Sequence, residues 1–193
     1  MSKKLRALPG IKMPKGFTPY RAKSMAPPVH KVQLRYAEEE ALRIIADRIC
    51  GDKKWEIAKF HMDFSGRYPR ATLPESITAY LLEKRFILYN YQQSVNLGRT
   101  RLGGGVIDFW LPERGIALSV IGVVWHSIPG AIEKDEQVMA ATMNSIIEGV
   151  AVTAYIHLFD EDLYACSRDD TINLALSGIE LPRVITPIPN PFL

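Results

Sequence analysis

The sequence predicts an α/β fold: a mixed β-sheet flanked by helices, with an extended tail on each side of the domain. Two observations predict it. Between residues 86 and 124, three short apolar runs separated by brief turns follow a helix, which indicates an antiparallel meander. A helical pattern then separates the third run from a fourth, and such a crossover is typical of a parallel strand pair. The length of 193 residues suits one domain with extensions.

We expect four segments: a basic, proline-rich arm over 1–35, a helical lead-in over 36–71, the α/β domain over 72–178 and a proline-rich tail over 179–193. The arm has nine Lys and Arg and no acidic residue, which leaves fifteen basic against twenty-one acidic residues elsewhere. This asymmetry predicts that the arm binds phosphate groups or an acidic protein surface. Its basic residues are Lys3, Lys4, Arg6, Lys12, Lys15, Arg21, Lys23, Lys31 and Arg35.

The lead-in is predicted to contain a helix over 37–50, because Leu42, Ile45 and Ile49 share one helical face. Residues 52–71 have no clear period. We expect the aromatic side chains of Trp55 and Phe60 to anchor that stretch to the core.

The α/β domain is predicted to begin with a helix over 72–84. Thr72 is followed three residues later by Glu75, with a proline between them, which is the spacing of a capping box. The apolar run over 116–124 has no polar face, so that strand is expected to be buried on both sides. The other elements predicted are strands over 86–95, 106–111 and 151–158, a helix over 131–148, and a helix capped by Ser167 and ended by Gly178.

A series of short motifs carries a family resemblance. Gly104-Gly105-Val106-Ile107-Asp108-Phe109 precedes a strand that reaches Gly122, and Trp125-His126, Lys134-Asp135, Gly149 and Asp162-Leu163 follow in that order. This order resembles the PD-(D/E)XK nuclease superfamily, in particular its branch of very-short-patch-repair endonucleases. The resemblance covers about 90 residues, from Leu73 to Leu163, and it implies a restriction-endonuclease-like sheet.

The resemblance implies Mg²⁺-dependent cleavage or nicking of DNA. Asp108 matches the metal-binding aspartate, and Val120 matches the position whose backbone carbonyl takes part in metal binding. His126 matches a histidine that protonates the leaving oxygen. Glu75 lies where the family often has an acid on its first helix.

The sequence also departs from the superfamily pattern. Ser119 and Ile121 occupy the positions of the usual second-strand acid and lysine, and Val138 replaces an arginine. We therefore favour a non-catalytic protein on a nuclease-like fold, an assembly component whose two tails bind neighbouring subunits, such as a component of a virus or phage particle. The alternatives are a Mg²⁺-dependent DNA nickase or endonuclease that uses Asp108, His126 and Glu75, and a nucleic-acid-binding module without chemistry.

Other classes are disfavoured by what the sequence lacks. It has no apolar run of membrane-spanning length and no secretory signal, so we expect a cytoplasmic protein or one inside a virus or phage particle. No small-molecule substrate is expected. Cys50 and Cys166 lack metal-ligand spacing, which argues against zinc, and we expect them to be buried thiols in a reducing compartment.

Overall fold

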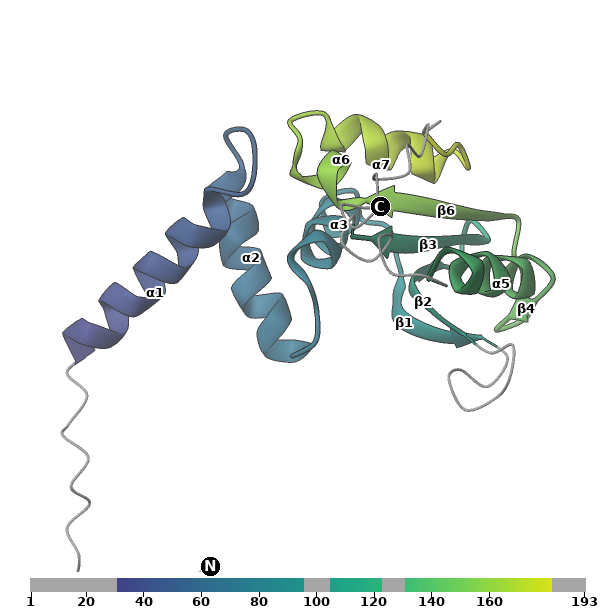
Figure 1. Cartoon of the computed structure of the whole chain (residues 1–193), viewed down its shortest axis with the longest axis horizontal. Coiled ribbons are helices and arrows are strands. Elements are labelled where there is room, and N and C mark those ends of the chain that lie inside the picture. Colours follow the sequence, from purple (N-terminus) through teal and green to yellow (C-terminus); the bar gives the residue numbers. More distant parts are fainter. Residues whose placement is uncertain (1–30, 96–104, 123–130, 182–193) are drawn as a thin grey trace, which may run out of the picture. The chain divides into compact units, whose positions relative to one another are not determined.

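The computed structural model describes residues 31–95, 105–122 and 131–181, with the backbone alone for residues 31–35, 131 and 132. The chain divides into two units, Met1–Tyr36 and Ala37–Leu193, and the second holds the sheet (Figure 1). Helix α1 (Lys31–Ala46) crosses the division. The last five residues of the predicted extended arm are therefore helical, and the basic side chains named for that arm lie outside the described part of the chain.

The stretch over 52–71, which has no clear period in the sequence, forms helix α2 (Lys54–Arg67). Ile57 and Phe64 are fully buried on one side of it, two turns apart. Phe60 packs against the same core, as expected. The expectation for Trp55 was wrong, because its side chain is 50% exposed.

Helix α3 (Leu73–Lys84) begins and ends where the sequence predicts. The Thr72 amide donates to Glu75 Oε2 at 2.5 Å, and the Glu75 amide donates to Thr72 Oγ1 at 3.4 Å, which completes the capping box. Every residue from Leu73 to Leu82 is buried. This helix therefore lies inside the domain rather than on its surface, and its start is a fixed point for the pocket described below.

The sheet has four strands in the order β1-β2-β3-β6. The first two pairs are antiparallel and the last is parallel, which confirms the predicted mixed sheet. The strand expected from Phe86 starts later, because Phe86 has a left-handed φ of 56° and points into solvent. The strand predicted to be buried on both faces, β3, is buried from Ile116 to Leu118 and at Ile121, whereas Ser119 and Val120 are half-buried. The strands are β1 (Asn90–Val95), β2 (Gly105–Leu111), β3 (Ile116–Ile121) and β6 (Ala154–Phe159).

Helix α5 (Ala131–Met143) ends earlier than the predicted limit of 148. A small hairpin follows it, made of β4 (Ile146–Ile147) and β5 (Val150–Ala151). Glu148 and Gly149 connect the two strands with φ angles of 52° and 83°. Two consecutive left-handed residues form the turn that tight hairpins favour. The sequence pattern missed this hairpin because its strands are only two residues long.

Two helices complete the domain: α6 (Asp160–Tyr164), which was not predicted, and α7 (Arg168–Leu176). Ser167 is the N-cap residue of α7, as predicted, but its side chain makes no capping hydrogen bond. Gly178 follows the helix with a φ of 74°, as expected at a helix end.

Helices cover both faces of the sheet (Figure 1). One core lies between the sheet and α2, α3, α6 and α7, and includes Phe109 and Leu118. A second core lies on the other face, where Trp110 and Ala117 pack with side chains of α5 and the β4–β5 hairpin. Within residues 31–95, 105–122 and 131–181, no helix combines the length and the apolar character that a membrane span requires.

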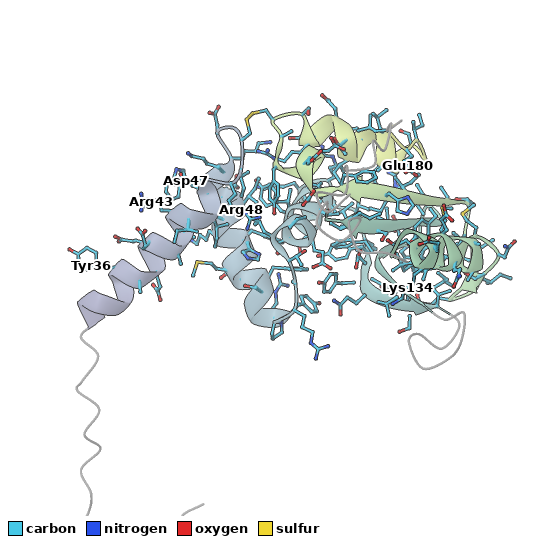
Figure 2. The ribbon with its side chains drawn as sticks, viewed as in Figure 1. Tyr36, Arg43, Asp47, Arg48, Lys134 and Glu180 are labelled. Carbon is cyan, nitrogen blue, oxygen red and sulfur yellow. A yellow bond between two sulfur atoms is a disulfide. The ribbon has the colours of Figure 1, made fainter. Side chains whose placement is uncertain are left out.

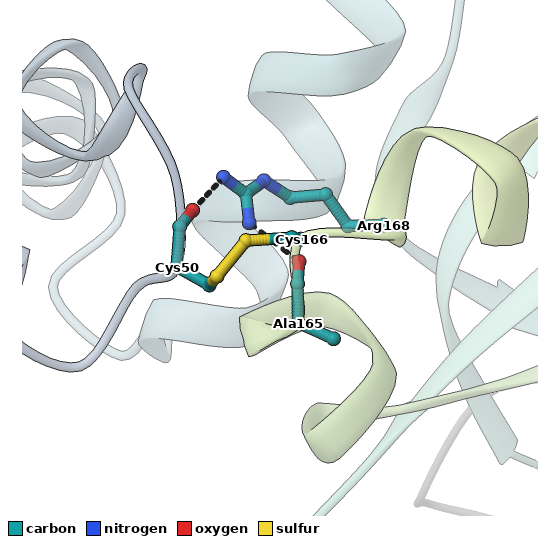
Figure 3. Close-up of a disulfide and its surroundings, with 4 residues drawn as sticks. All are labelled: Cys50, Ala165, Cys166 and Arg168. Carbon is teal, nitrogen blue, oxygen red and sulfur yellow. Dashed lines mark hydrogen bonds between the residues drawn. A yellow bond between two sulfur atoms is a disulfide. The ribbon is translucent and has the colours of Figure 1, made fainter.

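Cys50 and Cys166 form a disulfide, with their Cα atoms 5.0 Å apart (Figure 3). Both residues are exposed, so the expectation of two buried thiols was wrong. The disulfide joins the turn after α1 to the α6–α7 connection. Arg168 reinforces this junction, because its guanidinium donates to the Cys50 carbonyl and, at 2.6 Å, to the Ala165 carbonyl.

Candidate functional site

Asp108 lies where strands β2 and β3 cease to pair. Their register runs from Leu111 opposite Ile116 to Phe109 opposite Leu118 and then stops. Beyond this point, the Val120 amide donates to Asp108 Oδ2 at 2.7 Å instead of to a backbone carbonyl. The aspartate side chain thus replaces a ladder hydrogen bond, which satisfies the amide while the two strands separate.

The neighbouring pair β1–β2 is distorted at the same level. Ile107 and Phe109, on either side of Asp108, pair in register with β1. Gln92, the residue opposite Asp108, forms no bridge pair. Gln92 has a φ of 53°, a conformation that costs a non-glycine residue roughly 1–2 kcal/mol. Such strain persists only where the surroundings enforce it, and it is typical of functional sites.

The distorted residues Gln92, Asp108 and Val120 line a pocket of about 800 Å³. Its acidic side chains are Glu75 from α3, Asp108 from β2 and Asp160 from the start of α6. Its basic side chains are Arg48, from the turn after α1, and Arg70, from the α2–α3 connection. The remaining lining residues are Thr72, Leu73, Pro74, Gln92, Ser94, Val106, Val120, Gly122 and Tyr164.

Glu75 and Asp108 interact at the floor of this pocket. Glu75 is only 8% exposed, and one of its oxygens accepts from both the amide and the hydroxyl of Thr72. Burial raises the pKa of Asp108 to about 7. The hydrogen bond from the Val120 amide opposes this shift, whereas the charge of Glu75 and a hydrogen bond with Glu75 increase it. Burial and the charges of the two carboxylates also raise the pKa of Tyr91. The pocket therefore contains an acidic pair, in which Glu75 is buried and Asp108 is half-buried.

Three of the four predicted site residues come together here. Glu75, Asp108 and Val120 all line the pocket. The contact observed for Val120 is through its amide rather than its carbonyl. The N–H and C=O of one residue in an extended strand point to the same side, so the Val120 carbonyl also faces β2. His126 lies in 123–130, outside the described residues.

The positions that depart from the superfamily pattern have structural roles. Ser119 hydrogen-bonds to Asp108 and lowers its pKa, which partly offsets the effect of burial. Ile121 is buried in β3. Neither side chain carries charge into the pocket.

The acidic pair fits an Mg²⁺ ion better than it fits zinc. Among the described residues, no cluster of three or more His, Cys, Asp and Glu is arranged to hold a metal. Mg²⁺ is commonly bound by one or two carboxylates and several waters, whereas zinc sites use His and Cys. Burial, and to a lesser degree the charge of Glu75, raise the pKa of Asp108, so a bound cation would stabilise its ionised form. Glu75, Asp108 and the Val120 carbonyl are the oxygen donors that would hold such an ion.

Sequence reasoning missed the basic and neutral polar members of the pocket. Arg48 and Arg70 lie in the lead-in, where no local pattern marks them as functional. Arg70 precedes Thr72 of the capping box by two residues, and this proximity to Glu75 was the available signal. Gln92 had no signal, because its left-handed backbone cannot be recognised from a strand pattern.

Comparisons of the chain with models of protein families, with curated proteins and with solved structures found no match.

Proposed function

We propose that the chain is a metal-dependent nuclease that cleaves or nicks DNA at the pocket formed by Glu75 and Asp108. One observation supports this proposal above the others: two carboxylates from α3 and β2, distant in the sequence, form an acidic pair in a pocket of about 800 Å³, with Glu75 buried and Asp108 half-buried. Buried like charges are costly to fold, and clusters of perturbed acids in clefts are typical of active sites.

The chemistry required is hydrolysis of a phosphodiester. A water oxygen forms a bond to phosphorus, a bond from phosphorus to a sugar oxygen breaks, and that oxygen takes a proton. A Mg²⁺ ion, when bound, supplies charge neutralisation and lowers the pKa of a coordinated water. Glu75 and Asp108 contribute the negative charge that attracts the ion. The Val120 amide and the Thr72 cap fix the orientation of the two carboxylates.

The assembly role favoured from the sequence remains a prediction, because it depends on residues 1–35 and 179–193, most of which lie outside the described residues. The role as a nucleic-acid-binding module is separated from the nuclease proposal by the presence or absence of cleavage. The pocket geometry favours the nuclease, since neither alternative requires an acidic pair in a pocket.

Supercoiled plasmid incubated with the full chain in Mg²⁺, Mn²⁺ or EDTA tests this proposal. We expect nicked or linear product with metal and none with EDTA. Asp108→Asn should abolish cleavage. Asp63→Asn, the same change at an exposed aspartate outside this pocket, should retain it. Absence of cleavage with either metal, or equal cleavage by Asp108→Asn, would contradict the proposal.

A further inference from the structure

We propose that Arg48 and Arg70 bind phosphate groups of one nucleic acid strand at the rim of the acidic pocket. This inference rests on the proposed nuclease function, because the strand they hold is the one presented to Glu75 and Asp108. It adds a substrate-binding pair that the sequence motifs do not contain, drawn from the lead-in rather than from the nuclease-like segment.

Arg70 has no role in the packing of the domain. Its side chain is exposed, lines the pocket, and has no hydrogen bond or ion pair within the described part of the chain. The residue lies in the short connection that positions the capped start of α3, so its backbone is held close to Glu75. A guanidinium carries five donors in a planar fork that matches the oxygens of phosphate. Arg70 is therefore available for a ligand.

Arg48 is oriented by neutral contacts. One of its nitrogens donates to the Tyr164 hydroxyl at 2.9 Å, and its guanidinium lies 5.1 Å from the centre of the Tyr164 ring. Both residues line the pocket. The phenol itself is uncharged, and a guanidinium has five donors, so Arg48 has donors beyond the one that bonds Tyr164. Figure 2 shows Arg48 at the end of α1, with Arg43 further back along the same helix.

The disulfide fixes this rim. Arg48 precedes Cys50 by two residues, and Tyr164 precedes Cys166 by two residues. The Cys50 amide also donates to the Tyr164 carbonyl at 2.9 Å. Arg48 and Tyr164 are thus held together by a covalent bond and by backbone hydrogen bonding. A preorganised cation loses less freedom on binding than a mobile surface arginine.

Electrostatics explains why such a pocket needs a basic rim. A phosphodiester that approaches Glu75 and Asp108 is repelled by their charge, and this repulsion is strong where water is partly excluded. Two guanidinium groups on the same pocket offset it before any metal is considered. Gln92 and Ser94, which also line the pocket, add uncharged polar groups. An acidic floor beneath a basic rim suits a polyanion that must lie against carboxylates.

Binding of a fluorescein-labelled, mixed-sequence single-stranded oligonucleotide tests the inference. Fluorescence anisotropy would be measured with the full chain in EDTA over a salt series, so that cleavage cannot occur and the basic arm is intact in every variant. We expect Arg48→Gln and Arg70→Gln each to weaken binding several-fold, and each to reduce the slope of log K against log salt by about 0.7. Arg43→Gln, an exposed arginine of the same segment outside the pocket, should bind like the unsubstituted chain.

Arg48→Lys serves as a second variant, because it keeps the charge and loses the planar fork; we expect it to retain the salt slope and to recover part of the affinity. Unchanged affinity in Arg48→Gln and Arg70→Gln would overturn the inference, as would absence of binding by the unsubstituted chain. The nicking assay separates this result from the proposed function. If both variants still cleave DNA and bind it as before, the nuclease proposal is supported and the inference about the two arginines is contradicted. If both variants bind more weakly but the unsubstituted chain does not cleave, the inference about the arginines is supported and the nuclease proposal is contradicted.

Discussion

The carboxyl group of Asp108, which is half-buried, accepts a hydrogen bond from the Val120 amide and lies beside Glu75. The first contact stabilises the ionised carboxylate and the second destabilises it. Burial and the Glu75 charge are the stronger, because they raise the pKa to about 7. At neutral pH this residue therefore reduces the stability of the metal-free fold. Its position is better explained by ligand binding than by packing.

Asp108→Asn should stabilise the metal-free protein at alkaline pH. The folded pKa of about 7 exceeds the ordinary value of 3.8, so between these pH values the folded state binds more protons than the unfolded state. The stability of the unsubstituted chain therefore falls as pH rises from about 4 to about 7, then levels off. Asparagine can accept the Val120 hydrogen bond without ionising. We expect a gain on the order of 1–3 kcal/mol at pH 8 and little at pH 4.

Urea unfolding in EDTA at pH 4, 6 and 8 measures this difference. Asp63→Asn provides the exposed control, and its effect should be small at every pH. A difference between Asp108→Asn and the unsubstituted chain that does not grow with pH would contradict the interpretation of Asp108 as a strained acid.

At the scale of elements, two local devices fix the positions of the pocket carboxylates. The capping box starts α3 so that Glu75 is in its first turn. The second is the close packing of α5 on β2: the strand that carries Asp108 begins at Gly105, which lies directly against Val138 of α5. A Cβ built on Gly105 would lie 2.6 Å from Val138 Cγ1. The start of α3 depends on the hydroxyl of Thr72, and the close approach of α5 to β2 depends on the absence of a side chain at Gly105.

Thr72→Ala should lower the free energy of unfolding by about 0.5–2 kcal/mol, because the Glu75 amide loses its side-chain acceptor. Thr72→Ser keeps the hydroxyl and should cost much less. Chemical denaturation of the two variants gives the comparison. Equal losses for serine and alanine would show that the methyl group of Thr72, rather than its hydroxyl, stabilises the helix start.

Gly105→Ala should destabilise the fold by about 1–3 kcal/mol, because the added methyl group overpacks the α5–β2 contact. Val138→Ala removes the opposing methyl groups, so the double variant should be more stable than the sum of the single effects predicts. Gly66→Ala is the control. It lies in α2, with nothing within 4 Å of the added carbon, and should stabilise by about 0.5–1 kcal/mol. Additive effects at Gly105 and Val138 would contradict a direct clash.

At the scale of the whole domain, contacts between distant segments hold the pocket together. Two cores pack on opposite faces of the sheet, and the disulfide joins residues separated by 116 positions. The disulfide closes a long loop that contains the sheet, α2, α3 and α5. It also joins the segment of Arg48 to that of Tyr164, so it stabilises the pocket rim as well as the fold.

Cys50→Ser combined with Cys166→Ser should reduce the free energy of unfolding by about 2–5 kcal/mol, because the unfolded chain is no longer cross-linked. Reduction of the unsubstituted protein with a phosphine should give a similar loss. Urea unfolding with and without reductant measures both effects, and the double variant should not respond to reductant. Equal stability of the oxidised and reduced chain would contradict a stabilising role for this cross-link.

The sequence by itself determined the features encoded over a few residues. The capping box at Thr72 and Glu75 and the helix end at Gly178 depend on hydrogen bonds and backbone preferences between near neighbours. The strand order followed from short turns and one helical crossover, which leave few topologies open. Asp108 and Glu75 were named from a resemblance in the order of short motifs along the chain. The small β4–β5 hairpin and α6 were missed because elements so short carry no periodicity.

Only the tertiary structure decided which distant residues share the pocket. Arg48, Arg70 and Gln92 carry no local mark of function, and only the fold brings them into one pocket with Glu75 and Asp108. The pairing of Cys50 with Cys166 likewise depends on the path of the chain between them. The raised pKa of Asp108 also depends on the tertiary structure. The pKa reaches about 7 because the fold removes water from the carboxyl group and brings the Glu75 carboxylate beside it. Local pattern specifies the elements, whereas the charge, strain and cross-links of the site arise from contacts that packing alone creates.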